Sequence, residues 1–303
     1  MAIFDEKLQT FITLSETKSF TKTGEVTGLT QPAVTSQIKR LEEELNCTLF
    51  LRKKGEMTLS DEGEVALLYA KRLRAVAEKM RDRIRTAKSE IKKFRIGITH
   101  TQENGFMIDA MSRLIKENDK LNITLIADDI KNLYTMLENF ELDMAVLEGK
   151  PANKSFNFTV IDTDMLTLVV SKDSVLAKKS TVSLSELKKQ NLILRLPNSA
   201  TREKFASSLE AIGESLDEFN VVIEVDSVST IKNLVRKNAG VTVMSKSACL
   251  KEVNKGSLVS LPIENLSMIR ETAIVYDKSF SHPEIVDEIA KSYIDAKNGF
   301  YNA

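Results

Sequence analysis

Apolar positions recur at helical spacing through the first ninety residues, and strand-like patterns begin at Phe94. A helix is predicted to begin at Thr30, whose hydroxyl can accept a hydrogen bond from a free backbone N–H group. Pro32 suits the first turn, where its missing N–H costs little. The apolar residues of this helix recur at spacings of three and four, at Val34, Ile38, Leu41 and Leu45. One face is therefore predicted to pack, and the opposite polar face is free to contact another molecule.

A shorter helix is predicted immediately before this one. Ser19 can cap it, and Gly28 with Leu29 supplies a tight turn between the two helices. An earlier amphipathic helix contains Phe4, Leu8, Phe11 and Ile12. Helix, turn and second helix form the arrangement whose second helix enters the major groove of DNA. A plain three-helix bundle accounts for the same periodicity equally well.

Two short strands are predicted next, at 48–50 and 57–59, around the basic turn Arg52-Lys53-Lys54-Gly55. A basic turn is usually only a solvated surface feature. Here it directly follows a helix-turn-helix pattern, and contacts to phosphate supply much of the affinity of proteins for nucleic acids. The hairpin is therefore interpreted as a wing that grips the DNA backbone.

A long helix is predicted from Ser60 and Asp61, which can cap it, to about Ile91. Its apolar residues stand near heptad spacing, at Val65, Leu68, Leu73, Val76, Met80, Ile84 and Ala87. A single helix of this length cannot bury such a stripe by itself, so pairing with a second copy of the chain is expected. The alternative is packing against the C-terminal part of the same chain.

Strands alternate with helices after Phe94, which predicts an α/β domain with parallel pairing. Strands are expected at 94–99, 122–127, 142–147, 157–161, 166–170, 192–194, 221–225, 241–244, 257–261 and 272–276. Helices are expected at 108–117, 130–140, 184–189, 201–212, 229–237 and 282–296.

Length and charge agree with several compact units. A chain of 303 residues is expected to form two or three of them. The formal net charge is zero, but residues 1–93 carry 18 Lys and Arg against 14 Asp and Glu, and the remainder carries 25 against 29. A basic front half suits contact with a polyanion, although the excess is small.

Composition argues against several other classes of protein. Cys47 and Cys249 are too few and too far apart for a zinc site, and the sequence contains no nucleophile elbow, phosphate-binding loop or dinucleotide-binding glycine motif. The first ten residues carry acids rather than a secretory signal, and no apolar run approaches the ~18 residues that span a bilayer. No catalytic residue, metal, cofactor or membrane contact is therefore predicted, and a cytoplasmic protein is expected.

The segment from Ser19 to Glu64 resembles the N-terminal domain of LysR-type transcriptional regulators. The matching positions are Thr30 to Thr35 in the capped recognition helix, Leu41 to Asn46 at its end, Leu49, Phe50 and Arg52 in the wing, and Leu59, Ser60 and Gly63 at the start of the linker. The C-terminal part is similar to the effector domain of this family, including Ser199 to Arg202 and the strand at Ala239 to Met244.

The resemblance implies a multidomain architecture. An α-helical winged helix-turn-helix domain would occupy residues 1–59, a linker and dimerisation helix 60–91, and a two-lobed α/β effector domain 92–303. That last domain would have the type 2 periplasmic-binding-protein-like fold. Its lobe I would hold 94–163 and 265–303 and its lobe II 164–264, with chain crossings near Thr163 and Glu264.

The resemblance also implies which residues approach DNA. Base edges would be met by Gln31, Pro32, Ala33 and Thr35, and the backbone by Arg52 and Lys53; the full set of expected contacts adds Thr30, Ser36 and Lys39. Pro32 serves helix initiation equally well. Ser36 stands where the family often has a long polar side chain, which removes one candidate for bidentate reading of guanine. Gly24 stands where Ala is usual, which predicts a softer first helix.

An effector is expected between the lobes, at the carboxyl ends of strands and at helix N-termini, where free N–H groups favour anions. The expected contacts are Thr99, His100, Thr101, Ser199, Thr201 and Arg202. Hydroxyls with one guanidinium suit a carboxylate or another small oxyanion. Helix capping explains the threonines equally well, and a surface ion pair is a rival role for Arg202.

Together these features predict a sequence-specific DNA-binding transcriptional regulator that responds to a small anionic effector. Its expected partners are double-stranded DNA, the effector, further copies of itself in a homodimer or homotetramer, and RNA polymerase. The alternative is a ligand-independent architectural DNA-binding protein, because the response to a ligand is inferred from the fold alone.

Overall fold

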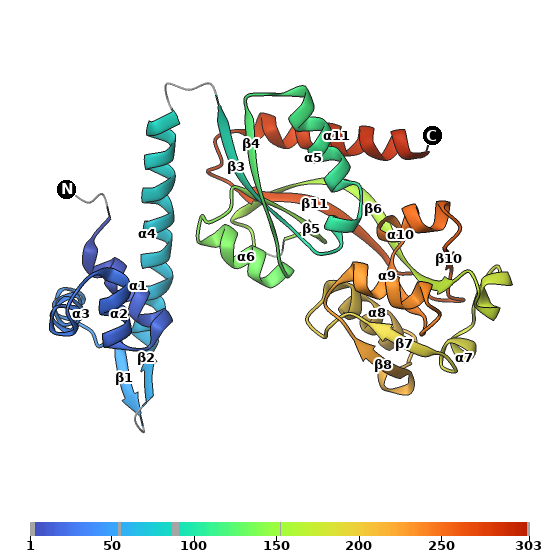
Figure 1. Cartoon of the computed structure of the whole chain (residues 1–303), viewed down its shortest axis with the longest axis horizontal. Helices are drawn as coiled ribbons and strands as arrows, with labels where there is room; N and C mark the ends of the chain where they lie inside the picture. The colour runs from blue at the N-terminus through green and yellow to red at the C-terminus, as the bar shows by residue number, and fades with distance from the viewer. Residues whose placement is uncertain (1–3, 54–55, 87–90, 152, 302–303) are drawn as a thin grey trace. The chain divides into compact units, whose positions relative to one another are not determined.

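A computed structural model describes the protein except at residues 1–3, 54–55, 87–90, 152 and 302–303 (Figure 1). The chain divides into two units. The first holds residues 1–91 and the short segment 138–141, and the second holds residues 92–137 and 142–303. In the part of the chain that the structure covers, no helix combines the length and the apolar character needed to cross a membrane.

Three short helices open the N-terminal unit: α1 (Glu6–Thr17), α2 (Phe20–Thr27) and α3 (Gln31–Leu45). The Ser19 hydroxyl accepts a hydrogen bond from the backbone N–H of Lys22 at 3.4 Å, which confirms the predicted start of α2. The Thr30 hydroxyl accepts one from the N–H of Ala33 at 3.4 Å, as predicted for α3. Gly28 ends α2 in the left-handed region, at φ 73°, which glycine adopts without strain.

Gly24 has a structural role in the turn between these helices. The backbone N–H of Leu29 donates to the carbonyl of Gly24 at 2.9 Å, so the turn folds back onto α2. A Cβ atom at position 24 would lie 2.5 Å from the carbonyl oxygen of Leu29. The missing side chain therefore makes room for the turn. The expected softening of α2 stays a prediction.

A wing and a long helix follow α3. Strands β1 (Phe50–Lys53) and β2 (Glu56–Leu59) form an antiparallel hairpin, and α4 runs over Asp61–Thr86. The hairpin and α4 pack against the three short helices in one core. The buried residues of this core are Phe11, Ile12, Leu14, Ile38, Leu41, Leu49 and Ala70. The Ser60 hydroxyl accepts from the N–H of Gly63 at 2.8 Å and fixes the start of α4, as predicted.

One face of α4 remains apolar and exposed. Its large side chains are Val65, Tyr69, Leu73, Val76, Met80 and Ile84, which are 44% to 65% exposed and recur at spacings of three and four. We call these six residues the α4 stripe. Five of the six were predicted, and Tyr69 was not. The predicted Leu68 is half-buried, and the predicted Ala87 lies outside the described residues.

The second unit begins with a five-stranded sheet, which we call lobe I. Its strands are β3 (Lys92–Ile98), β4 (Leu121–Ala127), β5 (Met144–Glu148), the first part of β6 (Phe156–Ser171), and β11 (Ile269–Asp277). The order is β6-β11-β5-β3-β4, with β3 parallel to β4 and β5 and with β11 antiparallel to β5 and β6.

Helices cover both faces of this sheet (Figure 1). They are η1 (Gln102–Asn104), α5 (Met107–Glu117), α6 (Ile130–Glu138) and α11 (Pro283–Tyr301). Phe94, Ile96 and Ile98 share a buried cluster with α5 and α11. A Cβ atom on Gly97 would lie 2.7 Å from the Leu133 side chain of α6, so the alternation along β3 sends successive residues to opposite faces.

Lobe II contains the second part of β6 and the chain that follows it. Its strands are β7 (Asn191–Leu194), β8 (Asn220–Glu224), β9 (Thr242–Ser245) and β10 (Leu258–Leu261). Its helices are η2 (Val175–Lys178), α7 (Leu184–Leu187), α8 (Ala200–Glu210), η3 (Leu216–Glu218), α9 (Val228–Arg236) and α10 (Lys246–Asn254). Strands β9 and β10 pair antiparallel with β6, and β7 runs parallel to β8.

Several sequence expectations for this unit need correction. The strands expected at 157–161 and 166–170 are one continuous strand, β6, and helix α10 was not predicted. Ile263 and Met268 belong to the buried cluster of lobe II, the partly buried Leu266 packs against it, and Thr163 pairs with Glu271. We therefore propose that the second crossing lies at Ile269 to Glu271, later than the expected position near Glu264.

Helix α10 joins the two lobes beside these crossings. Leu250 is buried in the core cluster of lobe I, although α10 also packs against β6, β9 and β10 of lobe II. The ammonium of Lys251 pairs with the Asp109 carboxylate of α5 at 2.9 Å. Where the chain crosses between the lobes, they are therefore joined by apolar packing of α10 as well as by the two strands β6 and β11.

Candidate DNA interface and interlobe cleft

Helix α3 separates a packing face from an exposed face. Val34, Ile38 and Leu41 are buried in the core of the N-terminal unit. The exposed residues are Gln31, Pro32, Thr35, Ser36 and Lys39, with Ala33 half-buried. The structure therefore brings the expected base-reading residues onto one accessible surface at the start of α3.

The polar side chains of this surface are only weakly engaged with the protein. The Thr35 hydroxyl donates to the carbonyl of Gln31 at 3.0 Å, and the Gln31 amide lies 3.5 Å from the same hydroxyl. The Lys39 ammonium, 76% exposed, is 3.9 Å from the Glu43 carboxylate. Such exposed contacts contribute little to stability, so these groups can turn toward an external partner at small cost.

The wing is described through its backbone. Arg52 pairs with Met57 and Lys53 with Glu56 across the hairpin. The side chains of Arg52 and Lys53, together with residues 54 and 55, lie outside the described part of the molecule. Their expected contact with the DNA backbone stays a prediction.

A cleft opens between the two lobes of the second unit. Its lining residues are Thr99, His100, Thr101, Asp128, Asp129, Ile130 and Glu148 from lobe I, and Arg195, Ser199, Ala200 and Thr201 from lobe II. The free space is about 250 Å³, counting the part that is open to solvent. Five of the six expected effector contacts line this cleft. They meet because the carboxyl ends of β3, β4, β5 and β7 surround one small space.

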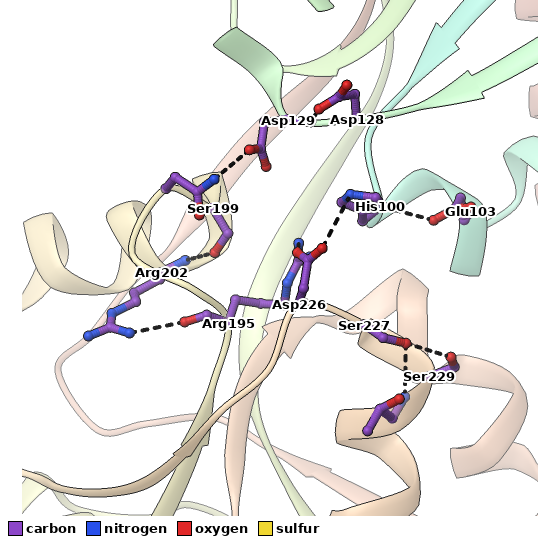
Figure 2. A network of polar contacts seen from close by, with 12 residues as sticks. His100, Glu103, Asp128, Asp129, Arg195, Ser199, Arg202, Asp226, Ser227 and Ser229 are labelled. Carbon is purple, nitrogen blue, oxygen red and sulfur yellow. Dashed lines mark hydrogen bonds and ion pairs between the residues drawn. The ribbon is translucent and has the colours of Figure 1, made fainter. Parts of the chain in front are cut away.

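Arg202 is the exception among the expected contacts. Its guanidinium pairs with the Glu224 carboxylate. It also donates to the carbonyl of Arg195 at 3.1 Å, as Figure 2 shows. It does not line the cleft. Arg202 therefore forms an ion pair, which was the alternative to a ligand contact. It supports the cleft only indirectly, by holding the backbone at Arg195.

The lobe I wall of the cleft is acidic. Glu148, whose side chain is 3% exposed, accepts from the Thr99 hydroxyl at 2.8 Å and from the Gln102 amide at 3.1 Å, both through Oε1. Its second oxygen, Oε2, is buried without a hydrogen-bond partner among the described residues. Asp128 and Asp129 add two half-buried carboxylates at the start of α6.

The lobe II wall combines a guanidinium with a helix N-terminus. Arg195 follows β7, is 6% exposed, and donates from Nη2 to Asp226 at 2.9 Å. Ser199 caps α8 by accepting from the N–H of Arg202 at 3.2 Å, and Thr201 accepts from Arg270 Nη1 at 3.3 Å. The first turn of α8 therefore faces the cleft with the partial positive charge of a helix N-terminus.

Polar contacts cross the cleft, and the one between His100 and Asp226 can be followed in Figure 2. The Asn198 amide of lobe II donates to the Asp129 carboxylate of lobe I. His100 Nδ1 lies 3.0 Å from Glu103, and His100 Nε2 lies 3.9 Å from the Asp226 carboxylate of lobe II. These contacts join the lobes through polar groups, of which Asn198 and Asp226 are exposed and His100 and Asp129 half-buried.

The sequence pattern missed the charged residues of the cleft. Glu148 and Arg195 each come directly after a strand predicted to end at Leu147 or Leu194, so their position at a carboxyl end was a usable signal. Gln102 and Arg270 gave no such signal, because their contacts to Glu148 and Thr201 join segments more than forty residues apart.

Comparison with known proteins places both units in one family. The model of the bacterial regulatory helix-turn-helix proteins of the LysR family matches residues 6–64, and the model of the LysR substrate binding domain matches residues 87–293. An uncharacterized HTH-type transcriptional regulator of Methanocaldococcus jannaschii is 28% identical over 286 residues, which cover 92% of this chain and 94% of the relative.

Solved structures share the fold. The LysR family regulator CbnR, solved in complex with its target DNA, superposes with a TM-score of 0.68 at 17% identity, covering 96% of this chain and 98% of that one. The regulatory domain of CcmR from Synechocystis, solved with 2-PG, gives a TM-score of 0.59 at 18% identity over 66% of this chain and 96% of that domain. With two family models covering most of its length, the chain belongs to the LysR family of DNA-binding transcriptional regulators.

Proposed function

We propose that this regulator reads DNA with the exposed face of α3 and the wing, assembles with itself through α4, and senses a small effector in the interlobe cleft. The observation that carries the proposal is the division of α3 into a buried face and an exposed polar face. Gln31, Thr35 and Lys39 would meet base edges, with Arg52 and Lys53 at phosphates. In this proposal the chain acts by regulating transcription together with RNA polymerase and not by catalysis.

The proposed effector carries an anionic group. The first turn of α8 offers backbone N–H groups to the cleft, and the hydroxyls of Thr99, Thr101 and Thr201 surround the same space. The CcmR regulatory domain, similar in fold, was solved with 2-PG, which supports a small anion as ligand. The space between the two walls is small, so the effector should be small as well.

The proposed assembly rests on the α4 stripe. Six large apolar side chains along one helix face are unfavourable in water, and a second copy of α4 would cover them. Two DNA-binding units would then meet two half-sites, which supports specificity even though each α3 has few long side chains for direct base contact.

The experiment that tests the proposal maps the DNA sites bound by the full chain across the genome. Binding to a recovered site and to a shuffled sequence is then compared by fluorescence anisotropy at one salt concentration. We expect the recovered site to bind at least ~10³-fold more tightly. Equal affinities would contradict sequence-specific regulation and favour an architectural role.

A further inference from the structure

The two walls of the interlobe cleft carry opposite charge. Lobe I contributes three carboxylates, those of Asp128, Asp129 and Glu148, and lobe II contributes the Arg195 guanidinium and the N-terminus of α8. A purely anionic ligand is attracted by one wall and repelled by the other. A ligand with both charges is attracted by both walls.

Glu148 provides the strongest observation on the acidic wall. Its side chain is 97% buried, as its 3% exposure shows, and it lines the cleft. Thr99 and Gln102 both donate to Oε1, and Oε2 has no partner among the described residues. A buried carboxylate oxygen without a donor is costly, so a ligand that donates hydrogen bonds to it is favoured.

Arg270 does not complete the environment of Glu148. Its Nη2 atom lies 3.9 Å from Oε1 of Glu148, which is beyond hydrogen-bond distance. Its Nη1 atom donates to Thr201, and both Nε and Nη2 are buried without a partner in the described structure. The negative charge of Glu148 is thus balanced only at a distance, and its Oε2 atom keeps an unused acceptor.

The basic wall shows the matching pattern. Arg195, 94% buried as its 6% exposure shows, also lines the cleft and uses Nη2 for Asp226 at 2.9 Å. Its Nε atom has no partner in the part of the chain that the structure describes. Together with the first turn of α8, Arg195 favours an acceptor such as a carboxylate on the lobe II side.

From this arrangement we infer that the effector is a small zwitterion of the amino-acid type, with its ammonium toward Glu148 and Asp129 of lobe I and its carboxylate toward Arg195 and α8 of lobe II. The inference rests on the proposed function, because it names the chemical class of the effector in that same cleft. Such a ligand joins the two lobes by one charge on each side. Its binding therefore favours the arrangement in which the walls stand close together.

The test uses the full chain and ligand pairs that differ in one group. The twenty standard amino acids are compared with the 2-hydroxy acids of the same side chains, with 2-PG and with MgCl₂ alone, by thermal shift and then by calorimetry. We expect at least one amino acid to raise the melting temperature and to bind at least ~10-fold more tightly than its 2-hydroxy counterpart, because the latter lacks the ammonium.

A charge-removing variant locates the ammonium site. Glu148→Gln should weaken binding of the amino acid by at least ~10-fold and leave binding of the 2-hydroxy acid within about 3-fold. Glu117→Gln is the matched control, because Glu117 is exposed on α5 and does not line the cleft. Should Glu148→Gln fail to fold, Asp129→Asn serves in its place, and the comparison on the unmodified chain needs no variant.

The outcomes separate this inference from the proposed function. Equal or tighter binding of the 2-hydroxy acids or 2-PG would overturn the zwitterion and leave an effector-responsive regulator in place. Stabilisation by MgCl₂ alone would overturn it as well. A chain that binds none of these probes would contradict both the inference and the proposed effector site, whereas the DNA-binding role is tested separately by site mapping.

Discussion

The exposed face of α3 and the interlobe cleft hold their polar groups in opposite ways. On α3, Thr35 and Lys39 are exposed and make weak contacts within their own helix. In the cleft, Glu148 and Arg195 are buried and each is tied to residues of distant segments. A surface that meets a large, rigid polyanion can leave its groups solvated, whereas a site for a small ligand has to hold them in place before binding.

In the proposed assembly the α4 stripe brings two copies of α3 together, so its disruption should have the largest effect. Leu73→Glu, in the middle of the stripe, should convert the oligomer to a monomer and weaken binding to a two-half-site DNA by about 100-fold or more, because the second contact is no longer intramolecular. Light scattering and anisotropy measure the two effects.

Leu45→Glu is the matched control for that change. Leu45 is 48% exposed on α3, close to the 54% of Leu73, but it lies outside the stripe. An unchanged oligomer in Leu73→Glu, or an equal loss in the control, would remove α4 from the assembly.

A second prediction compares the cost of losing one polar group in each region. Gln102→Leu removes a buried donor to Glu148 and Thr272, and should lower the free energy of unfolding of the second unit by about 1–3 kcal/mol. Gln31→Ala removes an exposed amide of α3 and should change stability by no more than about 0.5 kcal/mol. Urea denaturation followed by circular dichroism measures both, and similar values would erase the contrast between the regions.

The reading of bases by α3 is tested by Thr35→Ala. A good base contact supplies about 1–3 kcal/mol of discrimination. The difference in binding free energy between specific and random DNA should therefore fall by that amount, while the melting temperature stays constant. Anisotropy on a set of sites with single-base changes identifies the position that is relaxed. Equal losses on specific and random DNA would mean that Thr35 contacts only the backbone.

The smallest expected effect concerns the wing. Arg52→Ala should weaken binding to all sequences alike and flatten the salt dependence of affinity by about one charge, because one phosphate contact is lost. Lys178→Ala, on the surface of lobe II, is the control and should leave the slope unchanged. A slope that Arg52→Ala does not alter would count against a phosphate contact.

The contrast also explains what the sequence could reveal. The face of α3 follows from the period of one helix and the cap at Thr30, so the local pattern contains nearly all the information needed to predict it. Thr99 to Thr101 and Ser199 to Thr201 were found because strand ends and helix starts are local signals too.

The charged parts of the cleft depend on contacts between segments far apart in the chain. Arg270 reaches Thr201 and Gln102 reaches Thr272, and no periodicity reports such pairs. Arg202 was assigned to the cleft by its place in the first turn of α8, but Glu224 of the neighbouring strand holds it elsewhere. The sequence predicts two strands in place of β6 because its polar centre, around Asp162 to Asp164, lacks the apolar pattern of its ends.

The contact that α10 makes with lobe I sets the direction in which the two lobes can move. Leu250 lies in the core of lobe I, and β6 and β11 remain paired beside it, so separation there would expose apolar surface and break backbone hydrogen bonds. On the side of α6 and α8, a polar contact between Asn198 and Asp129 joins the lobes. The apolar contact around α10 therefore acts as the hinge of the second unit, and the polar side of the cleft is the side that can open. A ligand of a few atoms binds far from this hinge, so a small displacement there corresponds to a rotation of one whole lobe.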